Sequence, residues 1–222
     1  MAMGKIIGVG AALAASVIVA GLANANTTTP QAIAYGPGLA PETNPFSIGL
    51  AFNQFNASLG TLTGVTITIS DNSSGTVNVT NNSPSQSSYT ISLGEQLSLK
   101  DPSNNALASY LDQSSSQNQT INAGDNQTIT ANASGTSTPV TINSNLSEFI
   151  GAGTITLTLG GSGVALVSGA TPYSAVTNST SDGEVTAVYD YTPVPSPGSG
   201  LLLFAGAMAV VGGMTLRRRV VR

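Results

Sequence analysis

Apolar and small polar residues alternate along short segments between residues 46 and 192. Within residues 61–70, the apolar side chains are those of Leu62, Val65, Ile67 and Ile69. Because successive side chains of a β-strand point to opposite faces, this alternation predicts a strand with one apolar face. Gly64 interrupts the alternation, which predicts a β-bulge at that point.

The same pattern predicts further strands at residues 76–80, 89–93, 97–99, 106–111, 119–122, 127–131, 153–159, 163–168 and 184–192. Clusters of Gly, Asn, Asp, Pro and Ser separate these segments and are typical of turns. We expect such turns at residues 71–75, 101–105, 124–126 and 160–161. The whole pattern predicts an all-β fold, an antiparallel β-sandwich of roughly ten strands over residues 46–192.

The alternation also predicts which apolar side chains point into the core. These are Leu62, Val65, Ile67, Ile69, Val77, Val79, Ile91, Leu93, Ile129, Ile155, Leu157 and Val188. One helical signal interrupts the strands at residues 145–150, where Asn145 is a candidate cap and Glu148 stands at the capping-box position. Gly151 is expected to end that turn.

The N-terminal segment has the pattern of a secretory signal peptide. Lys5 precedes an apolar run over residues 6–22, and Ala23 and Ala25 form a small-residue cleavage site. We therefore expect a signal helix in residues 1–25, with cleavage after Ala25 by signal peptidase following passage through the Sec translocon. The alternative is a segment that stays uncleaved as a second anchor. Residues 26–45 are expected to be a leader with one edge strand.

The C-terminal segment predicts a membrane anchor. A proline-rich stretch at residues 193–199 precedes residues 200–216, which contain no charged residue, and a basic tail follows at residues 217–222. Seventeen helical residues span about 25 Å, close to the thickness of a bilayer core. The tail carries Arg217, Arg218, Arg219 and Arg222. Because such clusters stay cytoplasmic, the residues upstream are expected outside the inner membrane.

Charge and composition narrow the possible functions. Residues 26–192 hold all ten acidic residues and only one basic residue, Lys100, so their net charge is −9. This sign excludes nucleic acid as a partner. The chain has no His and no Cys, which excludes Ser-His-Asp and Cys-His catalysis and the usual transition-metal ligands. We predict no catalytic residue, cofactor or metal. We interpret six acids as solvated turn residues: Glu95, Asp101, Asp112, Asp125, Asp182 and Glu184.

The C-terminal segment resembles the PEP-CTERM sorting signal of Gram-negative bacteria, which consists of a Val-Pro-Glu-Pro-like motif, a transmembrane helix and an arginine cluster. Val194, Pro195 and Pro197 match the motif, whereas Ser196 stands where Glu is usual. The resemblance implies recognition and cleavage by exosortase, a membrane-embedded cysteine protease. The alternative is a plain single-pass anchor with a proline-rich stalk.

Residues 46–192 resemble the choice-of-anchor ectodomains of exported bacterial proteins, the E type in particular. The resemblance lies in residues 55–62 leading into 65–69, in residues 146–158, and in residues 189–193. It implies a role at the cell surface or in the extracellular matrix and no active site.

We therefore expect a non-enzymatic exported protein. The first alternative is a carbohydrate-binding module for exopolysaccharide, which requires at least two tyrosines on one exposed face. The tyrosines available are Tyr35, Tyr89, Tyr110, Tyr173, Tyr189 and Tyr191. A second alternative is a secreted hydrolase, which requires two carboxylates that converge in a cleft.

Overall fold

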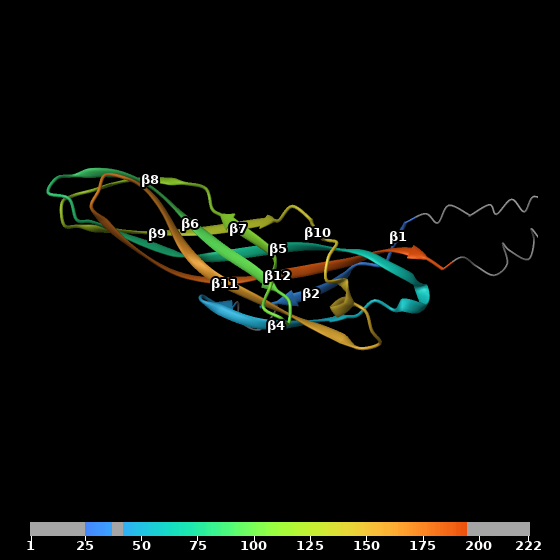
Figure 1. The fold of residues 1–222 in the computed structure, drawn as a ribbon. Coiled ribbons are helices and arrows are strands. Elements are labelled where there is room, and N and C mark those ends of the chain that lie inside the picture. The colour runs from blue at the N-terminus through green and yellow to red at the C-terminus, as the bar shows by residue number, and fades with distance from the viewer. Residues whose placement is uncertain (1–24, 37–41, 195–222) are drawn as a thin grey trace, which may run out of the picture. The chain divides into compact units, whose positions relative to one another are not determined.

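Two antiparallel sheets form the domain described by the computed structural model, which covers residues 25–36 and 42–194 (Figure 1). The predicted signal helix, the predicted membrane helix and the arginine tail lie outside these residues. Within the described ranges, no helix has the length and apolar character needed to cross a membrane. The all-β class and the two-sheet architecture predicted from the alternation are confirmed.

The first sheet has seven strands and the second has five. The first contains β1 (Asn26–Thr27), β2 (Gln31–Tyr35), β3 (Glu42–Thr43), β5 (Gly60–Asn81), β9 (Asn126–Thr136), β10 (Val140–Ile142) and β12 (Tyr173–Pro193). The second contains β4 (Phe46–Asn53), β6 (Ser87–Lys100), β7 (Ala106–Gln113), β8 (Gln117–Ile121) and β11 (Thr154–Gly169). Two short 3-10 helices complete the domain, at Ala57–Leu59 and Leu146–Phe149.

Four strands are much longer than the alternation predicted. Strands β5, β6, β11 and β12 contain 22, 14, 16 and 21 residues. The turns predicted at residues 71–75 and 160–161 are therefore wrong, because both segments lie inside continuous strands. The predicted break between residues 89–93 and 97–99 is also wrong, since both belong to β6. The turn at residues 101–105 is confirmed: the Asp101 N–H donates to the Asn105 carbonyl, and Asn104 has a positive φ.

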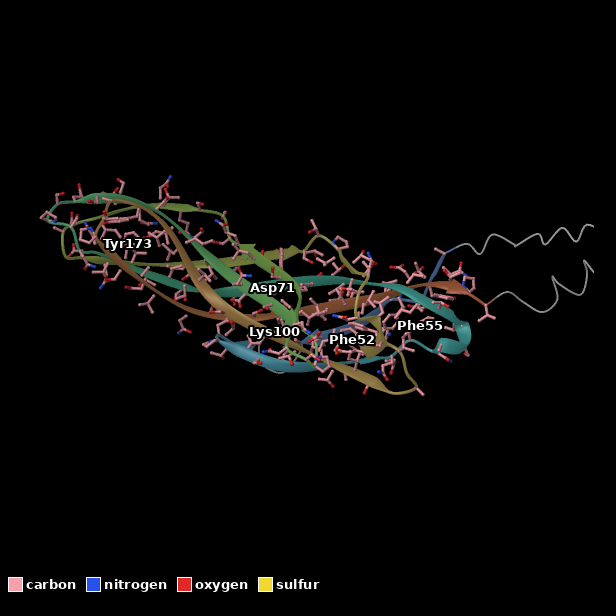
Figure 2. All side chains as sticks on the ribbon, in the orientation of Figure 1. Phe52, Phe55, Asp71, Lys100 and Tyr173 are labelled. Atoms are coloured by element: carbon pink, nitrogen blue, oxygen red, sulfur yellow. The ribbon has the colours of Figure 1, made fainter. Side chains whose placement is uncertain are left out.

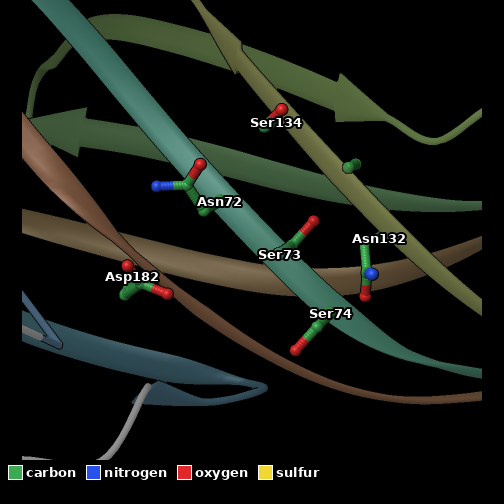
Figure 3. Close-up of a pocket in the computed structure, with 7 residues that line it drawn as sticks. Asn72, Ser73, Ser74, Asn132, Ser134 and Asp182 are labelled. Atoms are coloured by element: carbon green, nitrogen blue, oxygen red, sulfur yellow. The ribbon is translucent and has the colours of Figure 1, made fainter.

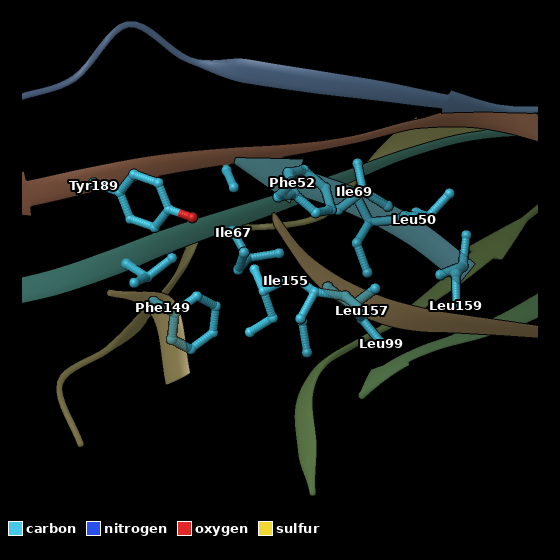
Figure 4. Close-up of a cluster of buried hydrophobic side chains, with 14 of the residues drawn as sticks. Leu50, Phe52, Ile67, Ile69, Leu99, Phe149, Ile155, Leu157, Leu159 and Tyr189 are labelled. Atoms are coloured by element: carbon cyan, nitrogen blue, oxygen red, sulfur yellow. The ribbon is translucent and has the colours of Figure 1, made fainter. Parts of the chain in front are cut away.

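The buried apolar side chains form two separate clusters. The larger one, core 1, lies between β4, β5, β6, β11 and β12 and includes Phe52, Ile67, Leu157 and Tyr189 (Figure 4). The smaller one, core 2, includes Val77, Tyr89, Ile91 and Ile129. Every predicted core residue except Val188 is buried. Val188 is half-buried, because β12 turns its neighbours Ala187 and Tyr189 inward instead.

Two local predictions have different outcomes. The bulge is confirmed, because Asp190 pairs with Gly64 while Tyr191 pairs with Leu62, which leaves Thr63 without a partner on β12. The helical signal at residues 145–150 gives a single 3-10 turn, Leu146–Phe149. The predicted capping is wrong: Asn145 adopts a left-handed conformation and makes no capping hydrogen bond with its side chain.

The predicted leader contributes three short strands rather than one. Strands β1, β2 and β3 all pair with β12, so residues 26–45 extend the edge of the first sheet. In the same sheet β12 also pairs with β5 over most of its length. The segment thereby places Tyr35 and Asn44 against the interior of the sandwich.

Candidate functional site

A band of buried polar residues crosses the interior between core 1 and core 2. We call it the polar belt and define it by Tyr35, Asn44, Asp71, Ser73, Glu95, Tyr110, Asp112, Ser179 and Ser181. In Figure 2, Asp71 lies between Phe52 and Phe55 of core 1 and Tyr173, which packs against core 2. The acidic residues of the belt are almost fully buried: Asp71 is 1 %, Glu95 0 % and Asp112 3 % exposed.

Strand register brings two of these acids together. On neighbouring antiparallel strands, Glu95 of β6 stands directly opposite Asp112 of β7. Side chains of such a pair point to the same face, with Cβ atoms about 4.5–5.5 Å apart. Asp71 comes from β5 in the other sheet, where its partners across the strands are Gly135 and Gly183. The belt therefore collects three carboxyl groups from both sheets.

Asp71 is held by hydroxyl groups. The Tyr35 hydroxyl donates to Asp71 Oδ1 at 2.6 Å, and the Ser181 hydroxyl donates to the same oxygen. The other oxygen, Oδ2, is buried without a hydrogen-bond partner among the described residues. Burial raises the pKa of Asp71, and the hydrogen bonds from Ser181 and Tyr35 counteract only part of that effect.

Glu95 is held by an amide. The Asn44 Nδ2 group donates to Glu95 Oε2 at 2.6 Å and also to Ser179 Oγ at 2.9 Å. Glu95 Oε1 is buried and has no partner among the described residues. Burial and the negative charge of Asp71 raise the pKa of Glu95 to about 8. An ordinary glutamate is ionised at neutral pH, whereas Glu95 is largely protonated there.

Asp112 also has one carboxyl oxygen with hydrogen-bond donors and one without. Its Oδ1 atom accepts the Gln113 backbone N–H at 2.9 Å and the Tyr110 hydroxyl at 3.4 Å, a long contact. Its Oδ2 atom is buried without a partner among the described residues. Burial raises the pKa of Asp112 as well. Each of the three carboxyl groups thus has one oxygen that accepts hydrogen bonds and one that accepts none.

Glycines leave the space that these groups occupy. A Cβ atom at Gly161 of β11 would lie against the Phe46 ring and 2.8 Å from Glu95 Oε1. At Gly163 it would lie against Ser179 Oγ, and at Gly135 against the Tyr110 hydroxyl. The two sheets are therefore closely packed around the carboxyl groups at these positions.

Sequence reasoning missed this site. The interpretation of Glu95 and Asp112 as solvated turn residues is wrong, since both are buried inside strands. Asp182 and Glu184 also lie within β12 rather than in a turn, although Glu184 is exposed and Asp182 half-buried. Asp101 and Asp125 do lie in connections between strands, but Asp101 is buried there and accepts from the Asn105 N–H at 2.7 Å. Lys100, the one basic residue of the described ranges, lies five residues from Glu95 on β6, which corresponds to ~16 Å along the strand.

The features required by the two alternative functions can be located in the structure. Among the tyrosines, Tyr35, Tyr89 and Tyr189 are buried, and the other three are half-buried against the cores, so none stands on an exposed face. A shallow pocket between β5 and β9 is lined by Asn72, Ser73, Ser74, Asn132, Ala133, Ser134 and Asp182 (Figure 3). Its one carboxylate, Asp182, does not make the pair that glycoside hydrolysis uses. The described residues contain no group of three or more His, Cys, Asp or Glu that could hold a metal ion.

The predicted processing residues lie at the ends of the described domain. Ala25 is exposed directly before β1, and Val194 directly follows β12. Asn26 pairs with Tyr191, and the Val194 N–H donates to the Leu59 carbonyl at 3.2 Å. The two ends of the domain therefore lie side by side at one end of the first sheet (Figure 1). Ala23, Pro195, Ser196, Pro197 and the four arginines fall outside the described residues.

Comparisons with known proteins add little to this geometry. No family model matches the sequence, and no curated protein matches it. Solved structures with some similarity come from infectious bursal disease virus. The Gx strain is 15 % identical over 78 % of this chain, with a TM-score of 0.19. Virus-derived T=1 particles are 12 % identical over 74 %, with a TM-score of 0.21. The chain spans about 37 % of the first of these structures. Scores this low carry no argument about fold or function.

Proposed function

We propose that this chain is a non-enzymatic exported protein that its C-terminal segment holds at the inner membrane until exosortase cuts near Pro195. The released domain then belongs to the cell surface or the extracellular matrix. The proposal combines the PEP-CTERM-like tail with an ectodomain of the choice-of-anchor kind. One structural observation supports it most: the strand ladder begins directly after Ala25 and ends at Pro193, two residues before Pro195.

This observation matters because a protease needs an extended, accessible chain. Asn26 is already paired with β12, and Pro193 is the last residue of β12. Val194, which opens the motif, is 59 % exposed. Pro195 and Pro197 disfavour helix and favour an extended polyproline conformation. The described chain therefore enters the ladder at Asn26 and leaves it after Pro193, and the two expected cleavage sites are next to these points in the sequence.

We propose a role without catalysis for the domain. Its three buried carboxyl groups are enclosed by close packing, and its shallow pocket lacks a carboxylate pair. Ser196 replaces the glutamate of the usual motif, so any contact between that carboxylate and a basic group of the protease is lost. We accordingly propose that cleavage is slower than for the usual motif or is carried out by an exosortase variant.

Replacing Pro195 and Pro197 together with alanine tests the proposal. The double variant should remain uncut in the membrane fraction, because the extended motif is lost while residues 200–216 are unchanged. Fractionation followed by C-terminal mass spectrometry of the protein isolated from cells gives the readout. Pro102→Ala, in the exposed turn between β6 and β7, is the matched control and should be cut normally. Recovery of wild-type protein that still carries residues 200–222 would show a plain anchor and refute processing.

A further inference from the structure

We propose that the polar belt is a proton-operated latch between the two sheets: the closed sandwich keeps at least one of Asp71, Glu95 and Asp112 protonated, and loss of that proton loosens the middle of the domain. The inference goes beyond the proposed function, since it concerns how the domain responds to its surroundings after export.

Electrostatic repulsion disfavours the ionisation of all three carboxyl groups. Like charges directly opposite one another on neighbouring strands are destabilising, and Glu95 and Asp112 occupy such a pair. Asp71 adds a third carboxyl from the opposite sheet. A buried ionised carboxylate needs a cation or several hydrogen-bond donors, and otherwise it takes up a proton. Lys100 is too far along β6 to supply the positive charge.

The belt also has few hydrogen-bond donors for these carboxyl groups. Asp71 accepts two hydrogen bonds on one oxygen and none on the other, and Glu95 and Asp112 each likewise leave one buried oxygen without a partner. An ionised carboxylate has about four acceptor positions to fill, whereas a protonated one has fewer. Asn44 Oδ1, a further buried acceptor, also lacks a donor among the described residues. The belt therefore supplies too few donors for three ionised carboxylates.

The groups that surround the carboxyls from the other elements are neutral. They are Tyr35 on β2, Asn44 before β4, Tyr110 on β7, and Ser179 and Ser181 on β12. Burial raises the pKa of both tyrosines, so their hydroxyls stay protonated. β9 and β11 contribute glycines at this level. Among the remaining acids, Asp182 on β12 raises the pKa of Asp71 further.

A bound cation is the competing explanation for the unpartnered oxygens. In the described residues, however, the acids do not form a group of three that could hold a metal ion. We assign protons rather than a metal to the belt, and the calcium experiment below tests that choice.

The pH window follows from the direction of the pKa shifts. Unfolded Glu95 loses its proton near pH 4.5, whereas folded Glu95 keeps its proton up to about pH 8. Between these values the folded state binds more protons, so stability decreases as pH rises. Below about pH 4.5 Glu95 is protonated in both the folded and the unfolded state. Above about pH 8 it is ionised in both, and the stability that its proton provided is fully lost. The raised pKa values of Asp71 and Asp112 act in the same direction.

Thermal melts of the purified full-length protein in detergent micelles test the latch. Between about pH 5 and pH 8.5 the Tm of the wild type should fall by roughly 5–10 °C. Glu95→Gln replaces the carboxyl with a neutral group of the same shape, so most of that fall should disappear. Glu184→Gln, on the exposed face of β12, is the matched control and should keep the wild-type fall. A flat wild-type profile, or a Glu95→Gln profile like that of the wild type, would overturn the proposal.

A direct titration keeps the proposal testable even if Glu95→Gln does not fold. Carbon-13 NMR of the wild-type side-chain carboxyls should show one glutamate that titrates at least about two pH units above the others. If all glutamates titrate together near their ordinary pKa, the latch is refuted. The same sample decides between proton and metal: if calcium removes the pH dependence of Tm, a cation occupies the belt and the proton latch is wrong.

Discussion

Neighbouring residues on β5 have opposite surroundings. Ile67 is fully buried in core 1, where it lies close to Leu157 and Ile155 (Figure 4). Thr68, the next residue, points to the outer face and stands opposite Thr186 of β12. The two side chains therefore contribute very differently to stability, although only one peptide bond separates them.

Truncation of these two side chains should show the difference. Ile67→Ala removes buried methyl and methylene groups and leaves a cavity, so it should lower the free energy of unfolding by roughly 2–5 kcal/mol. Thr68→Ala removes a half-buried hydroxyl and should change that free energy by less than about 1 kcal/mol. Denaturant unfolding of the two purified variants measures both values. Equal losses would mean that the strand register described above is incorrect.

Glycine at position 75 shows why a turn-like residue can belong to the interior of a strand. A Cβ atom there would lie against the Asn178 carbonyl oxygen and the Ser179 side chain of β12. Gly75 therefore allows β12 to approach β5 closely beside the polar belt. A local preference for turns is here outweighed by contact with a strand about a hundred residues later in the chain.

Strand β5 passes through the belt without a break. Residues 71–75 pair with β12 on one side and with β9 on the other, so their backbone groups are hydrogen-bonded within the sheet. A hairpin connection over the same residues would leave most of these groups open to water. The protection of these backbone amides from exchange can therefore distinguish a continuous strand from a turn.

Hydrogen exchange at about pH 5 should distinguish the two arrangements. The amides of Asp71, Ser73 and Gly75 should be protected as strongly as those of Ile67 and Ile69, because they belong to the same central ladder. The amide of Ser103, in the exposed turn after β6, serves as an unprotected reference. Rapid exchange across residues 71–75 would support the hairpin and contradict the long strand.

In β5, β6 and β11 the alternating pattern predicted both ends of the strand but not the segment between them, and in β12 it predicted only the second half. Ile69 and Val77 are eight residues apart, so both have the phase of the same inner face. The phase is kept through Asp71, Ser73 and Gly75, which is the signal that could have identified one strand. Locally, however, this Asp-Asn-Ser-Ser-Gly segment is typical of a turn. This segment can be buried because it faces polar or small residues on β6, β7, β11 and β12. The sequence pattern within the segment does not reveal those partners.

The acidic character of the belt was the least predictable feature. Glu95 follows a glycine and Asp112 precedes Gln113 and a run of serines, so both have polar neighbours in the chain. Only the pairing of β6 with β7 brings them opposite one another. Register between strands is a property of the whole sheet, and a single sequence with ordinary turn residues does not specify it.

Acidic and basic residues are concentrated in different parts of the chain. The described domain has Lys100 as its one basic residue, whereas four arginines stand at residues 217–222. A negatively charged domain followed by an apolar segment and a positive tail favours one orientation in the inner membrane. Under the proposed function, this tail sets the topology before any cleavage.

Replacing Arg217, Arg218 and Arg219 with serine should therefore weaken membrane retention or disturb orientation, since only Arg222 would remain to hold the tail in the cytoplasm. Protease accessibility of the domain in intact spheroplasts, together with fractionation, measures both effects. Arg222→Ser alone leaves three arginines and should behave like the wild type. Unchanged retention and orientation in the triple variant would show that the arginines do not direct this segment.

The pairing of β1, β2 and β3 with β12 also has a consequence for the order of folding. These first strands find their sheet partner only when residues 173–193 are present, and β12 lies between them and β5. Because synthesis starts at the N-terminus, the chain cannot complete this sheet strand by strand before β12 has been made. Until the last strand arrives, one edge of β5 stays open, and open edges promote aggregation. Contacts so distant in sequence also slow the search for the native state. A chain truncated before residue 173 would therefore be a target for chaperones and quality-control proteases rather than a smaller version of the domain.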